Sequence, residues 1–326
     1  MNVVYASDDN FAEIMGVSIC SLFENNKDVV ELTVYVLDDN ISIENKQKLD
    51  ELAKTYGREI KKISISSVTK EIAHLQQDRG GASQFSRLFL SKLLPDNCPR
   101  ALYLDCDTCI RTNIEKFYNQ DFEGNTICGV MDCISKQHRS RLGLKEAEIY
   151  INSGMMLIDL KAWKENQIEN KILEVIKKFH GSVPYADQGI LNLALQGKIK
   201  LDHPRYNCMS IFTAFSFDDL LKYRKPSACY SSADIEDAKK DPSIVHFVTL
   251  FCFSRPWFKK SSGPFFDEWR RYKQLSPWHD APARKIQKNL SQHLGACFYN
   301  FVPKGLSLPI LGFLHARIKP MLMGGL

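Results

Sequence analysis

Two aspartates separated by one residue follow an apolar segment about a third of the way along the chain. Arg100 to Leu104 reads as a buried strand, and Asp105, Cys106 and Asp107 continue it. Successive side chains of a strand point to opposite faces, so we expect Asp105 and Asp107 to share one face, with Cα atoms about 6 to 7 Å apart. Two carboxylates this close repel each other unless a divalent cation or a shared proton lies between them. The pair therefore indicates a cation site, although two solvated loop acids would give the same pattern.

The elements that would position these residues follow the order of an α/β protein. Apolar segments predict strands over 2–6, 31–37, 60–65, 100–107, 126–132, 150–160, 199–207 and 243–249. Periodicity and capping residues predict helices over 11–23, 42–56, 83–94, 163–179 and 187–195. Ligands of open α/β sheets bind beyond the carboxyl ends of the strands, so polar residues at these ends are candidates for a site.

Polar residues follow two further predicted strands. The first strand leads into Ser7-Asp8-Asp9-Asn10, without the glycine pattern of a dinucleotide-binding fold, and the strand over 126–132 ends in Asp132. Gly154 lies near the start of the strand over 150–160, where a glycine lets a ligand or a neighbouring backbone approach closely.

Three more residues have side chains that could bind a ligand. Asp187 and Gln188 lie in the first turn of a predicted helix, where an anion or a sugar hydroxyl could be bound. His246 lies within an apolar strand, where a histidine is more often a core residue. If its imidazole faced the two aspartates, it would complete a metal site of mixed oxygen and nitrogen ligands.

Length and composition indicate a globular protein with an unusual C-terminal segment. The 326 residues, 44% of them apolar, suit one large α/β domain over 1–260 and an extension over 261–326. The net charge of +5 comes from the end of the chain, because residues 281–326 contain six basic residues and no acidic one. The remainder is close to neutral, which argues against a nucleic-acid-binding surface.

Neither the N-terminus nor any internal segment predicts export or membrane insertion. Residues 1–6 lack the features of a signal peptide, and no apolar stretch approaches the length of a membrane span. The ten cysteines are scattered in apolar contexts, which favours buried thiols over disulfides or a zinc site. We therefore expect a cytoplasmic protein.

Five blocks of residues stand together in an order that is typical of one enzyme family. They are Ala6–Asn10, Tyr103–Asp107, Tyr150–Gly154 with Asp159–Leu160, Asp187–Gln188, and Ile244–Phe247 followed by Pro256–Trp257. They resemble glycosyltransferase family 8, retaining enzymes that use nucleotide sugars and include bacterial lipo-oligosaccharide galactosyltransferases and glycogenin. The resemblance implies a GT-A fold, an α/β architecture in which helices flank a single mixed central sheet, here with a helical C-terminal tail.

The resemblance also implies roles for individual residues. Asp105, Asp107 and His246 would hold Mn²⁺, with Mg²⁺ as an alternative, and the ion would bridge the diphosphate of a UDP-sugar. The other donor-binding residues would be Ala6, Asp8, Asn10, Arg87, Cys106, Asn152 and Arg255. Asp132, Asn152 and Asp187 would contact sugar or acceptor, and Gln188 and Asp187 would lie at the reacting carbon. An amide is a poor nucleophile, so we expect front-face attack, with the Gln188 carbonyl stabilising positive charge.

One segment departs from the family pattern. The metal histidine is usually followed by a glycine and then by a lysine shortly before Pro-Trp. Here residues 247–255 form a longer segment without glycine, and Arg255 replaces the lysine. Arginine also binds phosphate, but with a different geometry, so we expect the loop that closes over the donor to differ.

The function that the resemblance implies is transfer of galactose or glucose from UDP-galactose or UDP-glucose to a cell-surface glycan or glycolipid. A glycogenin-like self-glucosylating enzyme and a non-catalytic sugar-nucleotide or glycan-binding protein remain alternatives. The basic and apolar residues of 281–326 favour contact with the anionic lipids at the inner face of the cell membrane. The same residues would also suit a helix packed on the body of the protein.

Overall fold

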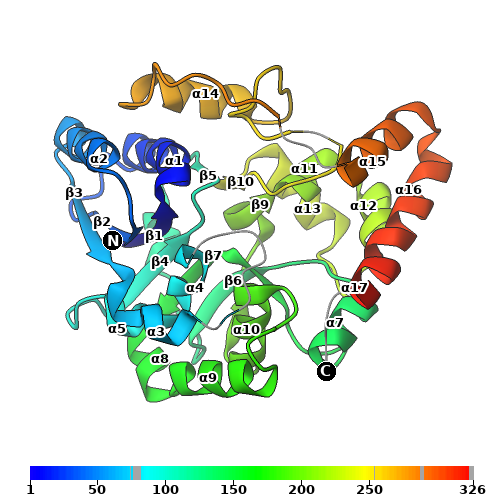
Figure 1. Cartoon of the computed structure of the whole chain (residues 1–326), viewed down its shortest axis with the longest axis horizontal. Coiled ribbons are helices and arrows are strands. Elements are labelled where there is room, and N and C mark those ends of the chain that lie inside the picture. Colours follow the sequence, from blue (N-terminus) through cyan, green and yellow to red (C-terminus); the bar gives the residue numbers. More distant parts are fainter. Residues whose placement is uncertain (74, 76–81, 253, 287–289, 323–326) are drawn as a thin grey trace.

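A seven-stranded sheet forms the centre of the computed structural model, which describes residues 1–73, 75, 82–252, 254–286 and 290–322 (Figure 1). Its strands, in spatial order, are β3 (Glu59–Ser64), β2 (Thr33–Asp39), β1 (Asn2–Asp8), β4 (Arg100–Leu104), β7 (Ile151–Asp159), β6 (Ile127–Met131) and β8 (Ile199–Leu201). β7 runs antiparallel to both of its neighbours, and the other neighbouring strands are parallel. The predicted mixed α/β architecture is confirmed.

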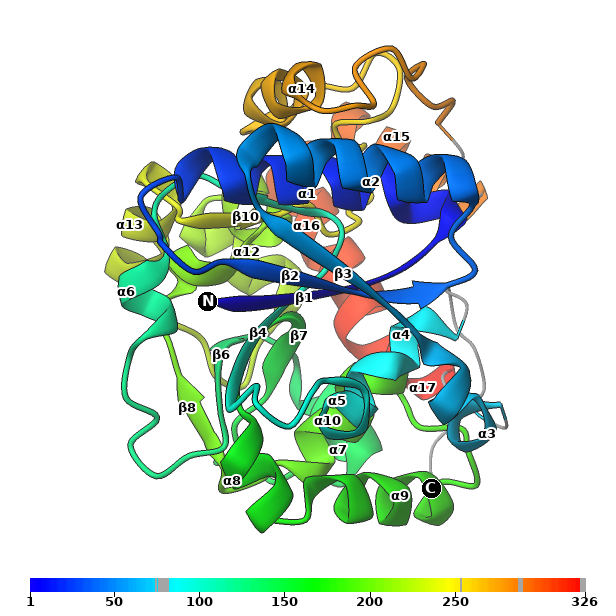
Figure 2. The same cartoon turned by 90° about the vertical axis from the view of Figure 1, so that its left-hand side faces the viewer.

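Helices cover both faces of this sheet (Figure 2). One face carries α1 (Ala12–Asn25) and α2 (Ile43–Tyr56), and the other carries α5 (Leu90–Leu93), α8 (Leu160–Glu165), α9 (Ile168–Lys178) and α10 (Ala186–Ala194). Ser42 caps α2 by accepting a hydrogen bond from Asn45 N, and Gly57 ends it with φ of 59°, a conformation that glycine adopts without strain. Shorter helices along the chain are α3 (Thr69–Ile72), α4 (Ser83–Ser86), α6 (Glu115–Tyr118) and α7 (Lys136–Leu142).

A second, three-stranded sheet was not predicted. It consists of β5 (Thr108–Ile110), β10 (Ile244–His246) and β9 (Cys208–Met209), in the order β5-β10-β9. The helices α11 (Ser210–Ala214), α12 (Phe217–Arg224) and α13 (Ser232–Lys240) follow β9 in the chain. This sheet brings His246 next to the residues that follow β4, because His246 pairs with Thr108.

The structure corrects the predicted course of the chain at Asp105 and Asp107. β4 ends at Leu104, and both aspartates lie in a turn before β5, not on a continuous strand. Thr108 Oγ1 closes this turn by donating to Asp105 O over 2.9 Å. After Asp107 the chain forms β5 over Thr108–Ile110, which is stabilised by its pairing with β10.

Two predicted helices are also divided. The segment 163–179 contains the end of α8 and the whole of α9, separated where Gln167 adopts a left-handed φ of 51°. The segment 83–94 consists of α4, a 3₁₀ turn over Arg87–Phe89 and α5. The strand predicted over 243–249 is shorter and ends at His246.

The C-terminal region is helical, as predicted. It comprises α14 (Phe266–Leu275), α15 (Leu290–Phe301), α16 (Lys304–Phe313), a π-helical turn over Leu314–Ile318 and α17 (Lys319–Leu322). The Trp278 ring packs against Gly16 of α1, and its Nε1 donates to Asn45 Oδ1 of α2 over 2.8 Å. None of the helices in the described residues has the length and apolar character needed to cross a membrane.

Candidate active site

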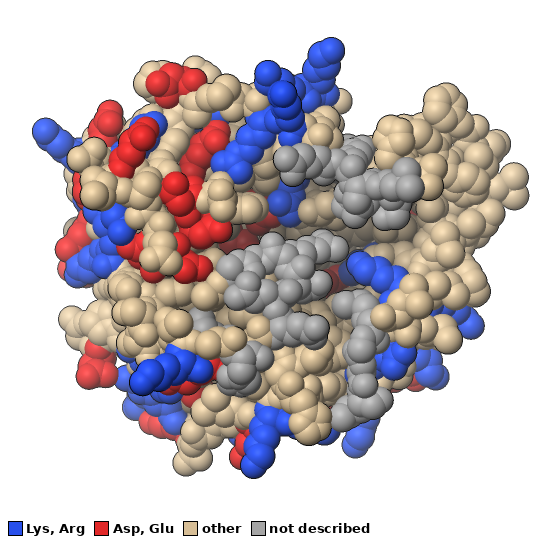
Figure 3. Space-filling model, viewed as in Figure 1, with Lys and Arg blue, Asp and Glu red and all other residues tan. Residues whose placement is uncertain are grey.

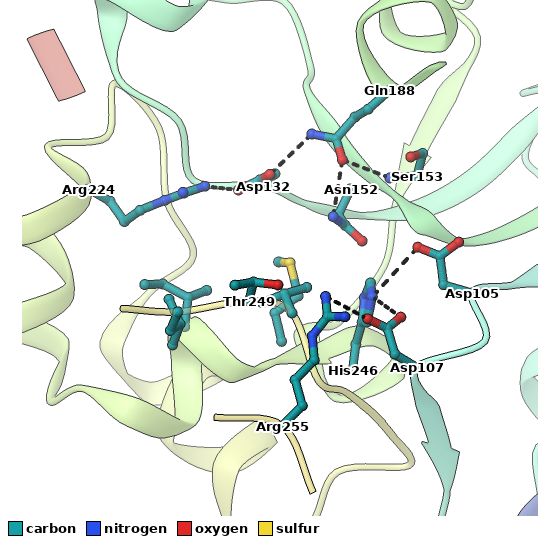
Figure 4. A pocket seen from close by; sticks show the side chains of 14 residues that line it. Asp105, Asp107, Asp132, Asn152, Ser153, Gln188, Arg224, His246, Thr249 and Arg255 are labelled. Atoms are coloured by element: carbon teal, nitrogen blue, oxygen red, sulfur yellow. Dashed lines mark hydrogen bonds and ion pairs between the residues drawn. The ribbon is translucent and has the colours of Figure 1, made fainter. Parts of the chain in front are cut away.

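A polar pocket of about 290 Å³ opens where the two sheets meet (Figure 4). It is lined by Asp105, Asp107, Asp132, Asn152, Ser153, Gln188, Met209, Ile211, Arg224, His246, Val248, Thr249, Leu250 and Arg255. The register of the strands explains this convergence. Because β7 is antiparallel to β4, the start of β7 lies beside the end of β4, and Asp105 N donates to Gly154 O over 2.8 Å.

Three side chains at one end of the pocket could hold a metal ion. Asp105, Asp107 and His246 each offer a ligand atom, and these atoms lie within 4.8 Å of one another. His246 Nε2 is 3.1 Å from Asp107 Oδ1 and 3.6 Å from Asp105 Oδ2. Mixed carboxylate and imidazole ligands suit a divalent transition metal such as Mn²⁺.

Gly154 makes room for this group of ligands. A Cβ atom at position 154 would lie 2.2 Å from His246 Cε1 and 2.6 Å from Asp105 Oδ2. The backbone at this glycine thus lies close to the side chains of two candidate metal ligands.

Arginines compensate the carboxylates of the candidate metal site. Arg87 Nη2 is 2.8 Å from Asp105 Oδ1, and Arg255 Nη2 is 3.1 Å from Asp107 Oδ2. Burial opposes ionisation of Asp107, but His246 and Arg255 outweigh it, so the pKa of Asp107 lies below its usual range. For His246, burial disfavours the charged ring, yet the neighbouring Asp107 and Asp105 raise its pKa. Arg255 therefore lies beside the candidate ligands despite the altered sequence that precedes it.

Hydrogen bonds fix the orientation of the Gln188 side chain on the pocket wall. Its Oε1 accepts from Asn152 Nδ2 over 3.1 Å and from Ser153 N over 3.3 Å. Its Nε2 donates to Asp132 Oδ2 over 3.2 Å and also contacts Tyr150 Oη at 3.0 Å. A backbone N–H at one end and a carboxylate at the other determine which atom of the amide is oxygen.

Arg87 and Asp187 lie behind the pocket wall and do not line it. Arg87 is buried and joins Asp105 to Asp187, whose Oδ2 is 3.3 Å from Arg87 Nη1. Asp187 also accepts from Ser153 Oγ over 3.1 Å. Burial raises the pKa of Asp187, and the charge of Arg87 opposes this effect. Both residues support the residues that line the pocket.

The residues predicted to bind the nucleoside lie at the end of β1 and outside the pocket lining. Asp8 caps the turn that precedes α1 by accepting from Phe11 N, and Asn10 Nδ2 donates to Asp8 Oδ2 over 3.3 Å. Cys106 is buried, and its thiol contacts Ala6 O at 3.2 Å. That contact joins the end of β1 to the turn that carries the aspartates.

The sequence did not identify Arg224 or Asn207 as candidate site residues. Arg224, the last residue of α12, lines the pocket and forms an ion pair with Asp132. Asn207 is fully buried and contacts both His246 and Asn152. A basic residue at a helix end and an asparagine before a short strand are ordinary features, so the sequence carried no signal for either.

The chain is similar to proteins of one family. Residues 2–261 match the model of glycosyl transferase family 8. The chain is 26% identical over 283 residues to general stress protein A of Bacillus subtilis, covering 86% of this chain and 95% of that protein. It is also 26% identical over 292 residues to a lipopolysaccharide 1,2-glucosyltransferase of Escherichia coli, covering 88% of this chain and 82% of that protein.

A crystal structure of the galactosyltransferase LgtC with donor and acceptor sugar analogues has a similar fold. Its TM-score is 0.72 at 22% identity, and the match covers 85% of this chain and 96% of that chain. This likeness confirms the predicted GT-A type of fold. Because the family model matches most of the sequence, the chain belongs to glycosyl transferase family 8.

Proposed function

We propose that this protein transfers galactose or glucose from a UDP-sugar to a glycan or glycolipid of the cell surface, with Mn²⁺ as its metal. The observation that carries the proposal is the convergence of Asp105, Asp107 and His246 at one end of a pocket whose wall contains Gln188. The similarity to a lipopolysaccharide glucosyltransferase supports a hexose donor and a glycan acceptor.

We assign to the side chains roles that fit their positions. Mn²⁺ held by the two aspartates and His246 would neutralise charge on the diphosphate as UDP leaves. Arg255, from the loop after β10, would contact the diphosphate, and Arg87 would hold Asp105 in place. Ala6, Asp8 and Asn10, at the end of β1, would contact uridine and ribose.

The remaining polar residues would surround the sugars. Asn152 and Gln188 line the pocket, and Asp187 supports this wall through Ser153. Asp132, which pairs with Arg224, would contact the acceptor. Two donors at Oε1 and the accepting Asp132 carboxylate at Nε2 hold the Gln188 amide in place against the pocket.

We infer that transfer retains the anomeric configuration by front-face attack. Gln188 is an unsuitable nucleophile, because it is an amide and its Oε1 already accepts two hydrogen bonds. Its carbonyl dipole would instead stabilise positive charge that develops at the anomeric carbon, and the leaving phosphate would take the proton of the acceptor hydroxyl. A covalent sugar adduct on any side chain would refute this mechanism.

We further propose that residues 1–260 form the catalytic domain and that the extension over 261–326 attaches it to the inner face of the cell membrane. One side of the C-terminal helices is apolar and exposed, with Phe301 86%, Leu306 62% and Leu322 81% accessible. The surface over α15 and α16 shows few charged side chains (Figure 3). Lys304 begins α16, and Arg317 lies in the π-helical turn that follows it; both would contact anionic headgroups.

UDP release from a panel of UDP-sugars, with and without Mn²⁺, tests the proposed activity. We expect Mn²⁺-dependent release with UDP-galactose or UDP-glucose, a loss of release in Asp107→Asn, and strongly reduced but measurable release in Gln188→Ala. Asp267→Asn is a matched control, because Asp267 is an exposed aspartate of α14 outside the pocket. UDP binding without release from any donor, in the presence of glycan acceptors, would instead support a non-catalytic protein.

A further inference from the structure

A fully buried asparagine lies between the candidate metal site and the wall that carries Gln188. Asn207 ends the 3₁₀ turn over Pro204–Asn207, directly before β9. Its Oδ1 is 2.9 Å from His246 Nδ1, and its Nδ2 donates to Asn152 Oδ1 over 2.9 Å. The side chain therefore touches one proposed metal ligand and one proposed sugar-binding residue.

The hydrogen bonds continue from Asn152 across the pocket wall. Asn152 Nδ2 donates to Gln188 Oε1, and Gln188 Nε2 donates to Asp132 Oδ2 (Figure 4). The direction of every bond is determined, because Gly154 N donates to Asn152 Oδ1 over 3.1 Å and the Asp132 carboxylate can only accept. Asn207 must then donate through Nδ2 and accept through Oδ1.

This direction determines the state of His246. Since Asn207 Oδ1 accepts, His246 Nδ1 carries a proton, and Nε2 is the nitrogen that faces Asp107 and Asp105. An outer hydrogen bond of this kind fixes the tautomer and the ring orientation of a metal-binding histidine.

We propose that Asn207 is a positioning residue that aligns the metal ligand His246 and the Gln188 amide through one continuous set of side-chain hydrogen bonds. This inference rests on the proposed function, because it assigns His246 to a metal and Gln188 to the reacting sugar. Loss of the Asn207 amide would release the imidazole ring and leave Asn152 Oδ1 without one of its donors. Both the affinity for metal and the rate of transfer would fall.

A second buried asparagine provides a matched control. Asn192 is also fully buried, but its side chain bonds only to backbone atoms in the described residues, namely Ile151 N, Ile151 O and Gln188 O. Replacing either residue by alanine removes a buried amide of the same size. Asn192→Ala should lower thermal stability and leave the affinity for Mn²⁺ unchanged, whereas Asn207→Ala should lower both.

A third variant separates the effect of Asn207 on His246 from its effect on Asn152. Asn207→Asp keeps an oxygen that accepts from His246 Nδ1, but it removes the donor to Asn152. Its affinity for Mn²⁺ should stay close to that of the wild type, while kcat for UDP release falls, because Asn152 would turn and no longer donate to Gln188. A purely structural role of Asn207 would not separate metal binding from turnover in this way.

The test is Mn²⁺ binding followed by electron paramagnetic resonance, without donor, on the wild type and these three variants. Circular dichroism first establishes that each variant is folded at the temperature of the titration. We expect Asn207→Ala to weaken Mn²⁺ binding by about 10- to 100-fold, the usual effect of removing an outer partner of a metal ligand. Unchanged Mn²⁺ affinity in Asn207→Ala would overturn the inference and leave the proposed function intact. A wild type that does not bind Mn²⁺ would refute the proposed metal site together with the inference.

Discussion

Glycine at position 154 leaves the space in which Asp105 and His246 approach each other. The glycine within an apolar strand indicated a close approach, but its partners became apparent only from the register of β7 against β4 and from the pairing of β10 with β5. The Asp-x-Asp pattern and the histidine were likewise recognised in the sequence. The hydrogen bonds of Asn207 and the ion pair of Arg224 depend on side-chain directions that no sequence pattern encodes.

Replacing Gly154 by alanine should damage the candidate metal site. The added Cβ would overlap His246 Cε1 and Asp105 Oδ2, so one of these ligands must move. We expect the affinity for Mn²⁺, measured by electron paramagnetic resonance, to fall by about tenfold or more, comparable to the loss of a supporting contact of a ligand. Gly305→Ala is the control, because among the described residues a Cβ at that position would meet open space beyond its own helix. Equal affinities in the two variants would contradict this account of Gly154.

At the scale of elements, long apolar and periodic segments were predictable and their ends were not. β1, β2 and α2 are formed by strongly patterned segments and lie close to their predicted bounds. The turn at Asp105–Asp107 was wrongly predicted as strand, because β5 is stabilised by β10, a partner more than a hundred residues away. The break between α8 and α9 depends on the left-handed conformation of Gln167, a residue without an intrinsic preference for it.

The contact between α12 and the π-helical turn over Leu314–Ile318 predicts sensitivity to acid. His315 Nε2 lies 3.1 Å from Arg224 Nη1, and burial together with the charge of Arg224 lowers the pKa of His315 well below its usual value. Below about pH 6.5 the unfolded chain therefore binds more protons than the folded protein does. As a result, the free energy of unfolding falls as the pH falls.

His315→Gln keeps an oxygen that can accept from Arg224 and removes the titration. Urea denaturation near pH 7.5 and near pH 5 should show that the wild type loses up to about 2 kcal/mol more stability than this variant. His180→Asn is the control, since His180 is exposed and asparagine tolerates its φ of 51°. The same pH dependence in the wild type and in His315→Gln would exclude His315 as a source of acid sensitivity.

At the scale of the whole molecule, the C-terminal segment has one packed and one exposed side. Leu308, Gly312 and Ala316 are buried, and a Cβ at position 312 would lie 2.2 Å from Lys222 O of α12. Ser135 Oγ donates to Ala316 O over 2.7 Å, which joins this segment to the chain just after Asp132. Deletion of the tail would therefore disturb the pocket wall, so substitutions on its exposed side are the sharper test of membrane contact.

A variant with Phe301, Leu306 and Ile310 replaced by serine should lose binding to anionic vesicles. These side chains are exposed on α15 and α16, so their replacement should leave the fold intact while removing the apolar contact with lipid. Sedimentation with phosphatidylglycerol vesicles at low salt measures the effect. Val30→Ser combined with Ile43→Ser is the control, because these residues are also exposed. Val30 precedes β2 and Ile43 begins α2, and these elements lie on the opposite side of the molecule from α15 and α16 (Figure 1). Vesicle binding equal to that of the wild type would argue that the tail has only a packing role.

The measurement that tests the central claim most directly is calorimetric titration of UDP, with and without Mn²⁺, into the wild type and Asp107→Asn. If Asp105, Asp107 and His246 hold an ion that bridges the diphosphate, Mn²⁺ will tighten UDP binding in the wild type by about tenfold or more. Asp107→Asn will lose that gain. UDP affinity that does not respond to Mn²⁺ in the wild type would contradict the claim that this pocket is a metal-dependent nucleotide-sugar site.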